Sequence, residues 1–281
     1  MANRMRALMA LVYVALVAGG VHAADGPNSM DSATEARLKA ALADPQRDQA
    51  NAARDPHRHP LETLKFFGLR QDMTVLEVYP GGGWWTEFLA PVLAPKGRYL
   101  AAHFDPSAQS EYAQRGLAAF KDKLAKDPDR YGKVHLTALV TAPGAADLVP
   151  PNSVDLVLTF RNLHSWMGQN QAKPMLDAMF RALKPGGYLG IKEHRASTAM
   201  PQDPKAQLGY VREDYATQLI ESAGFKLVAK SEVNANPKDT KDYPKGVWTL
   251  PPSFREGDVD RAKYAAIGES DRFTLLFQKP K

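Results

Sequence analysis

Three residues at the ends of two apolar segments are candidates for acid–base chemistry. His164 follows the run VDLVLTF, and Glu193 and His194 close the run YLGIKEH. The ordinary pKa of an imidazole lies near 6.5, so His164 is the best-placed candidate for a general base. Glu193 and His194 could orient a substrate, although an ion pair between Glu193 and Arg195 would be purely structural. The three side chains could also converge on a metal ion, but their spacing does not require one and we predict no metal.

The stretch VLEVYPGGGWWTEFL, residues 75–89, has the composition of a ligand-binding loop. Gly81, Gly82 and Gly83 place bare backbone after an apolar strand, where a ligand can approach the amides of the following helix. A tight structural turn would use the same residues. A dinucleotide site would need a third glycine in the pattern G-x-G-x-x-G, but Thr86 stands there, so a nicotinamide oxidoreductase is disfavoured.

The elements that must position these residues predict a doubly wound α/β fold. Helix-length segments lie between most of the apolar runs, and several runs are apolar at nearly every position, which is typical of a parallel sheet covered on both faces. Ligands bind such sheets beyond the carboxyl ends of the strands. The predicted strands are 73–79, 98–104, 134–140, 154–160, 187–193, 225–231 and 272–278, and the helices between them include 84–93, 107–126, 168–183 and 212–223.

The chain before the predicted sheet divides into two parts. Residues 1–23 combine two arginines, a short apolar run and a small-residue end, which is typical of a cleaved secretory signal peptide rather than a membrane anchor. Residues 24–68 are predicted to form a helical arm and strap, with Ser32 capping the first helix and Arg54 and Arg58 able to cover a carboxylate. We therefore expect an exported protein, periplasmic or secreted, with no stable membrane span after cleavage.

Composition excludes several classes of protein. The 281 residues are 44% hydrophobic and 24% charged, as expected for one globular domain with appendages. The formal net charge is +5 and falls to +3 once the two arginines of residues 1–23 are removed. The sequence contains no block of like charge, so nucleic-acid binding is not indicated. The absence of cysteine excludes disulfides, thiolate metal sites and a cysteine nucleophile.

Several segments resemble the class I S-adenosylmethionine (SAM) dependent methyltransferases. Glu77 to Gly83 resembles the first motif of that family, an acid that ends a strand before a glycine-rich loop, and NSVDLVLTFRNLH, LKPGGYLGIKEH, ESAGFKLV and FTLLFQKP resemble its later strands. The resemblance covers residues 73–280. It implies a Rossmann-like, mostly parallel seven-stranded sheet with an antiparallel last strand, an N-terminal helical extension, and methyl transfer from SAM. The chain also resembles the exported predicted methyltransferases, and the segments that carry this resemblance are RHPLETLKFFG, PGGGWWTEFLAP, VWTLPP and IGESDR.

The resemblance also implies a set of SAM-binding residues. Asp105 would bind the ribose hydroxyls, since a carboxylate accepts two hydrogen bonds from a diol. Tyr79 stands where the family usually has its first glycine, and Ala145 where an acid commonly meets the adenine. Trp84 and Trp85 could face the sulfonium or simply bury area in helix packing. The full set is Glu77, Tyr79, Gly81, Gly82, Gly83, Trp85, Asp105, Arg161 and Asn162.

An insertion, residues 233–271, interrupts the methyltransferase domain predicted for residues 69–281. It is too rich in aromatic residues for a solvated linker, so we expect it to shape the pocket of a small-molecule acceptor. SAM is made in the cytosol, which is at odds with export. The alternative is therefore a catalytically inactive, methyltransferase-like protein that binds a nucleoside-like or aromatic ligand, and Tyr79 and Ala145 favour it.

Overall fold

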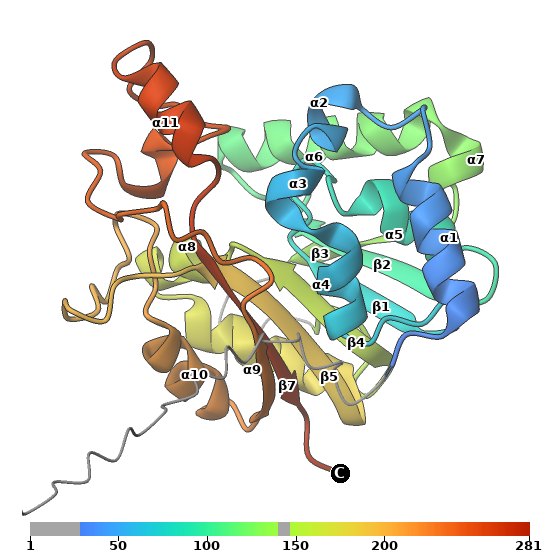
Figure 1. Cartoon of the computed structure of the whole chain (residues 1–281). Coiled ribbons are helices and arrows are strands. Elements are labelled where there is room, and N and C mark those ends of the chain that lie inside the picture. The colour runs from blue at the N-terminus through green and yellow to red at the C-terminus, as the bar shows by residue number, and fades with distance from the viewer. Residues whose placement is uncertain (1–28, 140–146) are drawn as a thin grey trace, which may run out of the picture.

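The computed structural model describes residues 29–139 and 147–281, and within them a central sheet of seven strands organises the chain (Figure 1). The strand order is β3-β2-β1-β4-β5-β7-β6. The strands are β1 (Thr74–Val78), β2 (Arg98–Phe104), β3 (Val134–Leu139), β4 (Val154–Phe160), β5 (Leu183–His194), β6 (Lys226–Ser231) and β7 (Arg272–Gln278). The signal peptide predicted for residues 1–23 and the adenine position Ala145 lie outside the described residues.

Strand directions confirm the predicted fold class. β1 pairs in parallel with β2 and β4, β2 with β3, and β4 with β5. β7 is antiparallel to both β5 and β6, and it lies between them although it follows both in the chain. The carboxyl ends of β1, β4 and β5 and the first residues of β7 therefore meet at one edge of the sheet.

Helices cover both faces of the sheet, as the apolar strands require. Val75 of β1 joins one hydrophobic cluster while Leu76 and Val78 join the other, because successive strand residues point to opposite faces. α5 (Thr86–Leu93) and α6 (Glu111–Lys126), with α7 (Pro128–Tyr131) beyond them, contribute to the first face. α8 (Leu163–Gly168), α9 (Ala172–Ala182) and α10 (Glu213–Glu221) contribute to the second.

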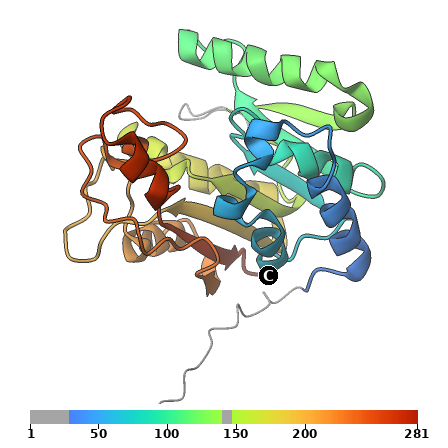
Figure 2. The ribbon, with the colours of Figure 1, turned by 45° about the horizontal axis from the view of Figure 1, so that its top comes forward.

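The N-terminal arm packs on the same face as α5. It contains α1 (Ser32–Leu42), α2 (Gln49–Ala52), α3 (Asp55–Arg58) and α4 (Pro60–Phe66), in blue in Figure 2. The prediction that Ser32 caps α1 is wrong by one residue, because the carboxylate of Asp31 accepts the backbone N–H of Thr34 and Ser32 is already helical. None of the helices in the described ranges is long and apolar enough to cross a membrane.

The insertion before β7 has its own small core. It contains a 3₁₀ helix, η1 (Gly246–Thr249), and α11 (Arg261–Ile267), the red helix at the periphery of both views. Tyr243, Leu250 and Tyr264 are buried against one another there. The insertion ends at β7 and therefore lies at the same edge of the sheet as the loops that follow β1 and β4.

Candidate functional site

A cavity of about 530 Å³ lies at the carboxyl ends of β1, β4 and β5. Its walls come from the loop after β1, the start of α8, the end of β5, the arm and the insertion. Two of the three predicted catalytic residues, His164 and His194, line it, and so do seven of the nine predicted SAM-binding residues: Glu77, Tyr79, Gly81, Gly82, Trp85, Arg161 and Asn162.

The three glycines of the loop have different surroundings. A Cβ atom added at Gly81 or Gly82 would meet no other atom within 4 Å, so open space faces this backbone. Gly83 has a φ of +76°, and its Cβ would lie 3.0 Å from the ring of Phe120. No side chain caps the first turn of α5, which starts three residues later. Gly81 and Gly82 thus leave room for a ligand, while Gly83 is needed for packing against α6.

Tyr79, at the position where the family resemblance expects a glycine, adopts a left-handed backbone conformation. Its φ is +58°, which costs a non-glycine residue about 1–2 kcal/mol. Its ring packs on His103 and Phe104, and its hydroxyl lies 3.1 Å from that of Tyr112. Asn162 supports the same turn, because its side-chain amide donates to the carbonyl oxygens of Val78 and Tyr79, at 3.0 and 3.2 Å.

Glu77 is a buried carboxyl group at the floor of the cavity. Its side chain accepts a hydrogen bond from the hydroxyl of Tyr99, which in turn lies 2.9 Å from the hydroxyl of Thr86. Burial raises the pKa of Glu77 to about 8, and the Tyr99 hydrogen bond opposes that rise. Sequence reasoning missed Tyr99 and also His103, whose Nε2 lies 3.1 Å from the carbonyl oxygen of Gly81.

Asp105, like Gly83, is a predicted SAM-binding residue that does not line the cavity. It follows the last paired residue of β2. Its carboxylate instead accepts hydrogen bonds from the backbone N–H and the hydroxyl of Ser107, at 2.7 and 2.6 Å. A short acidic side chain readily bonds to backbone two residues further on, and this local turn occupies the carboxylate of Asp105.

The two tryptophans after the glycines are packed against other groups. Trp84 donates its ring N–H to the carbonyl oxygen of Asn51 at 2.8 Å, and the guanidinium carbon of Arg58 lies 4.6 Å from its ring centre. Trp85 stacks on Phe160 with ring centres 3.9 Å apart, and Nζ of Lys192 lies 4.7 Å from the Trp85 ring centre. This arrangement favours the packing interpretation over contact with a sulfonium.

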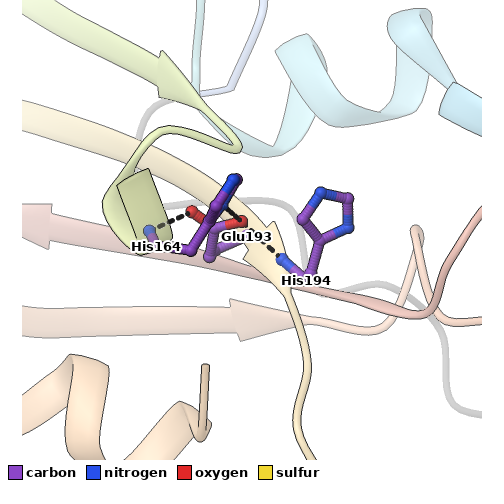
Figure 3. Close-up of side chains that lie close together, drawn as sticks. All are labelled: His164, Glu193 and His194. Carbon is purple, nitrogen blue, oxygen red and sulfur yellow. Dashed lines mark hydrogen bonds and ion pairs between the residues drawn. The ribbon is translucent and has the colours of Figure 1, made fainter. Parts of the chain in front are cut away.

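His164, Glu193 and His194 lie together where β4 and β5 end (Figure 3). Glu193 accepts the backbone N–H of His164 at 3.1 Å and that of His194 at 2.8 Å, and its Oε1 lies 3.0 Å from Nδ1 of His164. A carboxylate at Nδ1 favours the tautomer that carries its proton there, which leaves Nε2 of His164 able to accept a proton. Arg195 pairs with Glu232, at 2.7 Å, rather than with Glu193.

The same three residues are the one group of potential metal ligands found among the described residues. Their ligand atoms lie within 4.8 Å of one another. Nδ1 of His164 and the Glu193 carboxylate are paired with each other, however, and Nδ1 of His194 contacts the hydroxyl of Ser270. Burial lowers the pKa of His194, and the nearby His164 and Arg272 lower it further, so the imidazole of His194 is neutral at pH 7.

A cationic cluster lies beside the cavity; we define it as Arg54, Arg58, Arg161, Lys192 and Arg272. Three of its members share one carboxylate, Glu269, which contacts Nε of Arg54 at 2.7 Å, Nε of Arg58 at 3.2 Å and a terminal nitrogen of Arg272. Burial alone would raise the pKa of Glu269, but these arginines outweigh it and hold that pKa well below its usual range. Of the cluster, sequence reasoning noted only Arg54 and Arg58 as carboxylate partners.

Comparisons by sequence give one weak relationship. No protein-family model matches this chain. The ribosomal RNA large subunit methyltransferase E of two strains of Acidithiobacillus ferrooxidans is 30% identical to it over 141 residues, 47% of this chain and 56% of that protein. The chain therefore spans only about half the length of the curated relatives it matches.

Comparisons by structure cover most of the chain. A SAM-dependent methyltransferase from Aquifex aeolicus is 20% identical, covers 87% of this chain and 98% of its own, and gives a TM-score of 0.53. The [4+2]-cyclase SpnF is 16% identical, covers 90% of this chain and 98% of its own, and gives a TM-score of 0.55. At these identities the likeness concerns the fold, and the protein has the fold of the class I SAM-dependent methyltransferases.

Proposed function

We propose that the protein transfers a methyl group from SAM to a small-molecule acceptor. The observation that carries the proposal is the cavity itself, which has bare backbone at Gly81 and Gly82 on one side and His164 on the other. The open space at the two glycines fits a ligand that approaches the main chain, as SAM would. The cavity lies at the carboxyl ends of β1 and β4, where ligands bind in sheets of this topology.

The residues of the cavity have separate tasks in such a reaction. SAM, when bound, would supply an electrophilic methyl group on a sulfonium, with S-adenosylhomocysteine as the neutral leaving group when the acceptor takes the methyl group in line. Asn162 holds the turn at Tyr79 and so fixes the backbone that would contact the cofactor. His164 accepts the proton that the acceptor loses, at Nε2, and the Glu193 carboxylate stabilises the imidazolium that forms.

The alternatives differ in acceptor and in activity. The relative found by sequence is named as a ribosomal RNA methyltransferase, so RNA is a second candidate acceptor. A catalytically inactive binding protein would have no need of the His164–Glu193 pair, which favours the enzyme. The protein can be incubated with methyl-labelled SAM and either ribosomal RNA or a small molecule. The acceptor class is the one that gains the label.

Calorimetry with S-adenosylhomocysteine and NAD tests the proposed function. We expect the first to bind and the second not to. Gly82→Leu should weaken S-adenosylhomocysteine binding at least about tenfold, because the added side chain occupies the space proposed for the ligand. The melting temperature should not fall, because that space holds no atom of the described residues within 4 Å of the added Cβ. No binding of S-adenosylhomocysteine to the wild type, or equal binding by the variant, would refute the assignment of the cofactor to this loop.

We also propose export, as residues 1–23 indicate. N-terminal sequencing of protein recovered from its native host tests this. Processing after Ala23 is the expected result, and an intact Met1 would contradict it.

A further inference from the structure

The cationic cluster contains five basic side chains, and Glu269 is the carboxylate of the described residues that forms ion pairs with it. We propose that Arg54, Arg58 and Arg161 form a subsite for the acidic group, a carboxylate or phosphate, of the methyl acceptor. Arg161, which the family resemblance places among the SAM-binding residues, is thereby assigned to the acceptor instead. This inference rests on the proposed function and narrows it, since it makes the acceptor a small organic acid.

The charges around the cavity are strongly unbalanced. Four arginines line it, namely Arg54, Arg58, Arg161 and Arg255, whereas its one acidic lining residue is Glu77. Because the pKa of Glu77 is raised to about 8, this carboxyl group is mostly protonated at pH 7 and neutralises little of that charge. Glu269 does not line the cavity but pairs with Arg54 and Arg58, whereas Arg161 and Arg255 form no ion pair with a described residue. An anionic ligand would balance these two charges.

Two guanidinium groups of the cluster have a buried donor left over. Nη2 of Arg54 and Nη2 of Arg58 are buried without a hydrogen-bond partner among the described residues, although Glu269 contacts the Nε of both. Arg58 is only 2% exposed. An unmet donor on a buried charged group is costly, and arginine forks match the paired oxygens of carboxylates and phosphates.

Arg161 adds a third donor that faces the cavity. Its side chain makes no hydrogen bond or ion pair with a described residue, and burial lowers the pKa of Arg161 to about 10, helped by the nearby Arg272. Its backbone has a φ of +62° and is held there by donation from its N–H to the carbonyl oxygen of Lys192 at 2.7 Å. Such a backbone is costly for arginine, and strained positions of this kind concentrate at functional sites.

The position of Arg161 and Lys192 favours the acceptor over the cofactor as the source of the acid. The glycine loop belongs to β1 and α5, whereas Arg161 follows β4 and Lys192 belongs to β5. His164 lies in α8, four residues past the end of β4, and His194 ends β5, so an acid held by Arg161 would place the rest of the acceptor beside the proposed base. Phe160 and Trp248 also line the cavity, which suits an apolar body behind the acidic group.

Calorimetry with benzoate, inorganic phosphate and the neutral analogue benzamide tests the subsite. We expect the wild type to bind benzoate or phosphate at millimolar concentration, and at least about tenfold more tightly than benzamide. Hydrogen bonds to a charged carboxylate or phosphate are stronger than those to a neutral amide by about that factor in affinity. Arg161→Gln should abolish this preference, whereas Arg37→Gln, an exposed arginine of α1, should keep it. Arg54→Gln serves as a second variant if Arg161→Gln melts at a lower temperature. Equal binding of acid and amide, or no binding of either acid, would overturn the subsite.

A second comparison separates the two sources of the acid. S-adenosylhomocysteine carries an amino-acid carboxylate and methylthioadenosine lacks it. We expect Arg161→Gln to leave the affinity for both within about twofold. A tenfold loss for S-adenosylhomocysteine alone would assign the cluster to the cofactor and overturn the proposal. Benzoate or phosphate binding without any S-adenosylhomocysteine binding would instead refute the proposed cofactor while the anion site stands.

Discussion

Glu77→Gln is expected to remove a large part of the pH dependence of stability. Glu77 is 1% exposed, and the hydroxyl of Tyr99 donates to its side chain. Burial raises the pKa of Glu77 from its ordinary value of 4.5 to about 8. Between these two values the folded protein keeps a proton that the unfolded chain has lost, so the free energy of unfolding falls as pH rises.

The magnitude follows from that proton difference. One proton changes the free energy of unfolding by about 1.4 kcal/mol per pH unit, so the wild type should lose about 2–3 kcal/mol between pH 5 and pH 7 through this group alone. Glutamine resembles the protonated carboxyl in shape, still accepts from Tyr99 and does not titrate. The variant should therefore be favoured progressively over the wild type as pH rises.

Urea unfolding of both proteins at pH 5, 6 and 7 measures the difference, since every other titrating group cancels in the comparison. Glu111→Gln, whose side chain is 84% exposed on α6, is the control and should stay parallel to the wild type. If the Glu77→Gln and wild-type curves run parallel across this range, Glu77 is ionised in the folded protein and the argument from burial fails.

Further predictions concern a turn, a loop and a helix start. Gly83→Ala should destabilise the protein by about 1–3 kcal/mol in urea unfolding, because its φ is positive and its Cβ would crowd Phe120; an unchanged midpoint would mean that the loop adjusts freely. Asp105→Ala should leave the affinity for S-adenosylhomocysteine within about twofold by calorimetry, since the structure keeps Asp105 outside the cavity. A tenfold loss would show that its carboxylate turns inward to the ribose. Asp31→Ala should cost about 1 kcal/mol through the lost cap while Ser32→Ala costs less, and the reverse order in thermal unfolding would restore Ser32 as the cap.

The sheet could be predicted from the sequence because its signal is local. β4 (Val154–Phe160) is apolar at most positions, and both β4 and β7 (Arg272–Gln278) match their predicted bounds. β5 begins at Leu183, before the predicted 187, because Leu183 pairs with Val154 across an irregularity in the ladder. The antiparallel direction of β7 came from the family resemblance, since strand direction leaves no local pattern.

The contacts within the site could not be predicted, because they depend on register and on distant pairs. Phe160 of β4 pairs with Lys192 of β5, and this register brings Glu193 beside the start of α8, which carries His164. Arg54 reaches Glu269 across 215 residues of sequence. The motif that suggested a ribose contact at Asp105 did not show that Ser107, two residues later, would hold the carboxylate first.

The last strand to be synthesised, β7, occupies an inner place in the sheet. A nascent chain that stops short of Arg272 leaves β5 and β6 without their shared neighbour, so each has an unpaired row of amides and carbonyls on that side. The same chain has not yet placed Glu269 against the arm, so the wall of the cavity is incomplete. Ligand binding can thus stabilise only chains that include β7, and chains that stop before it should aggregate or be degraded.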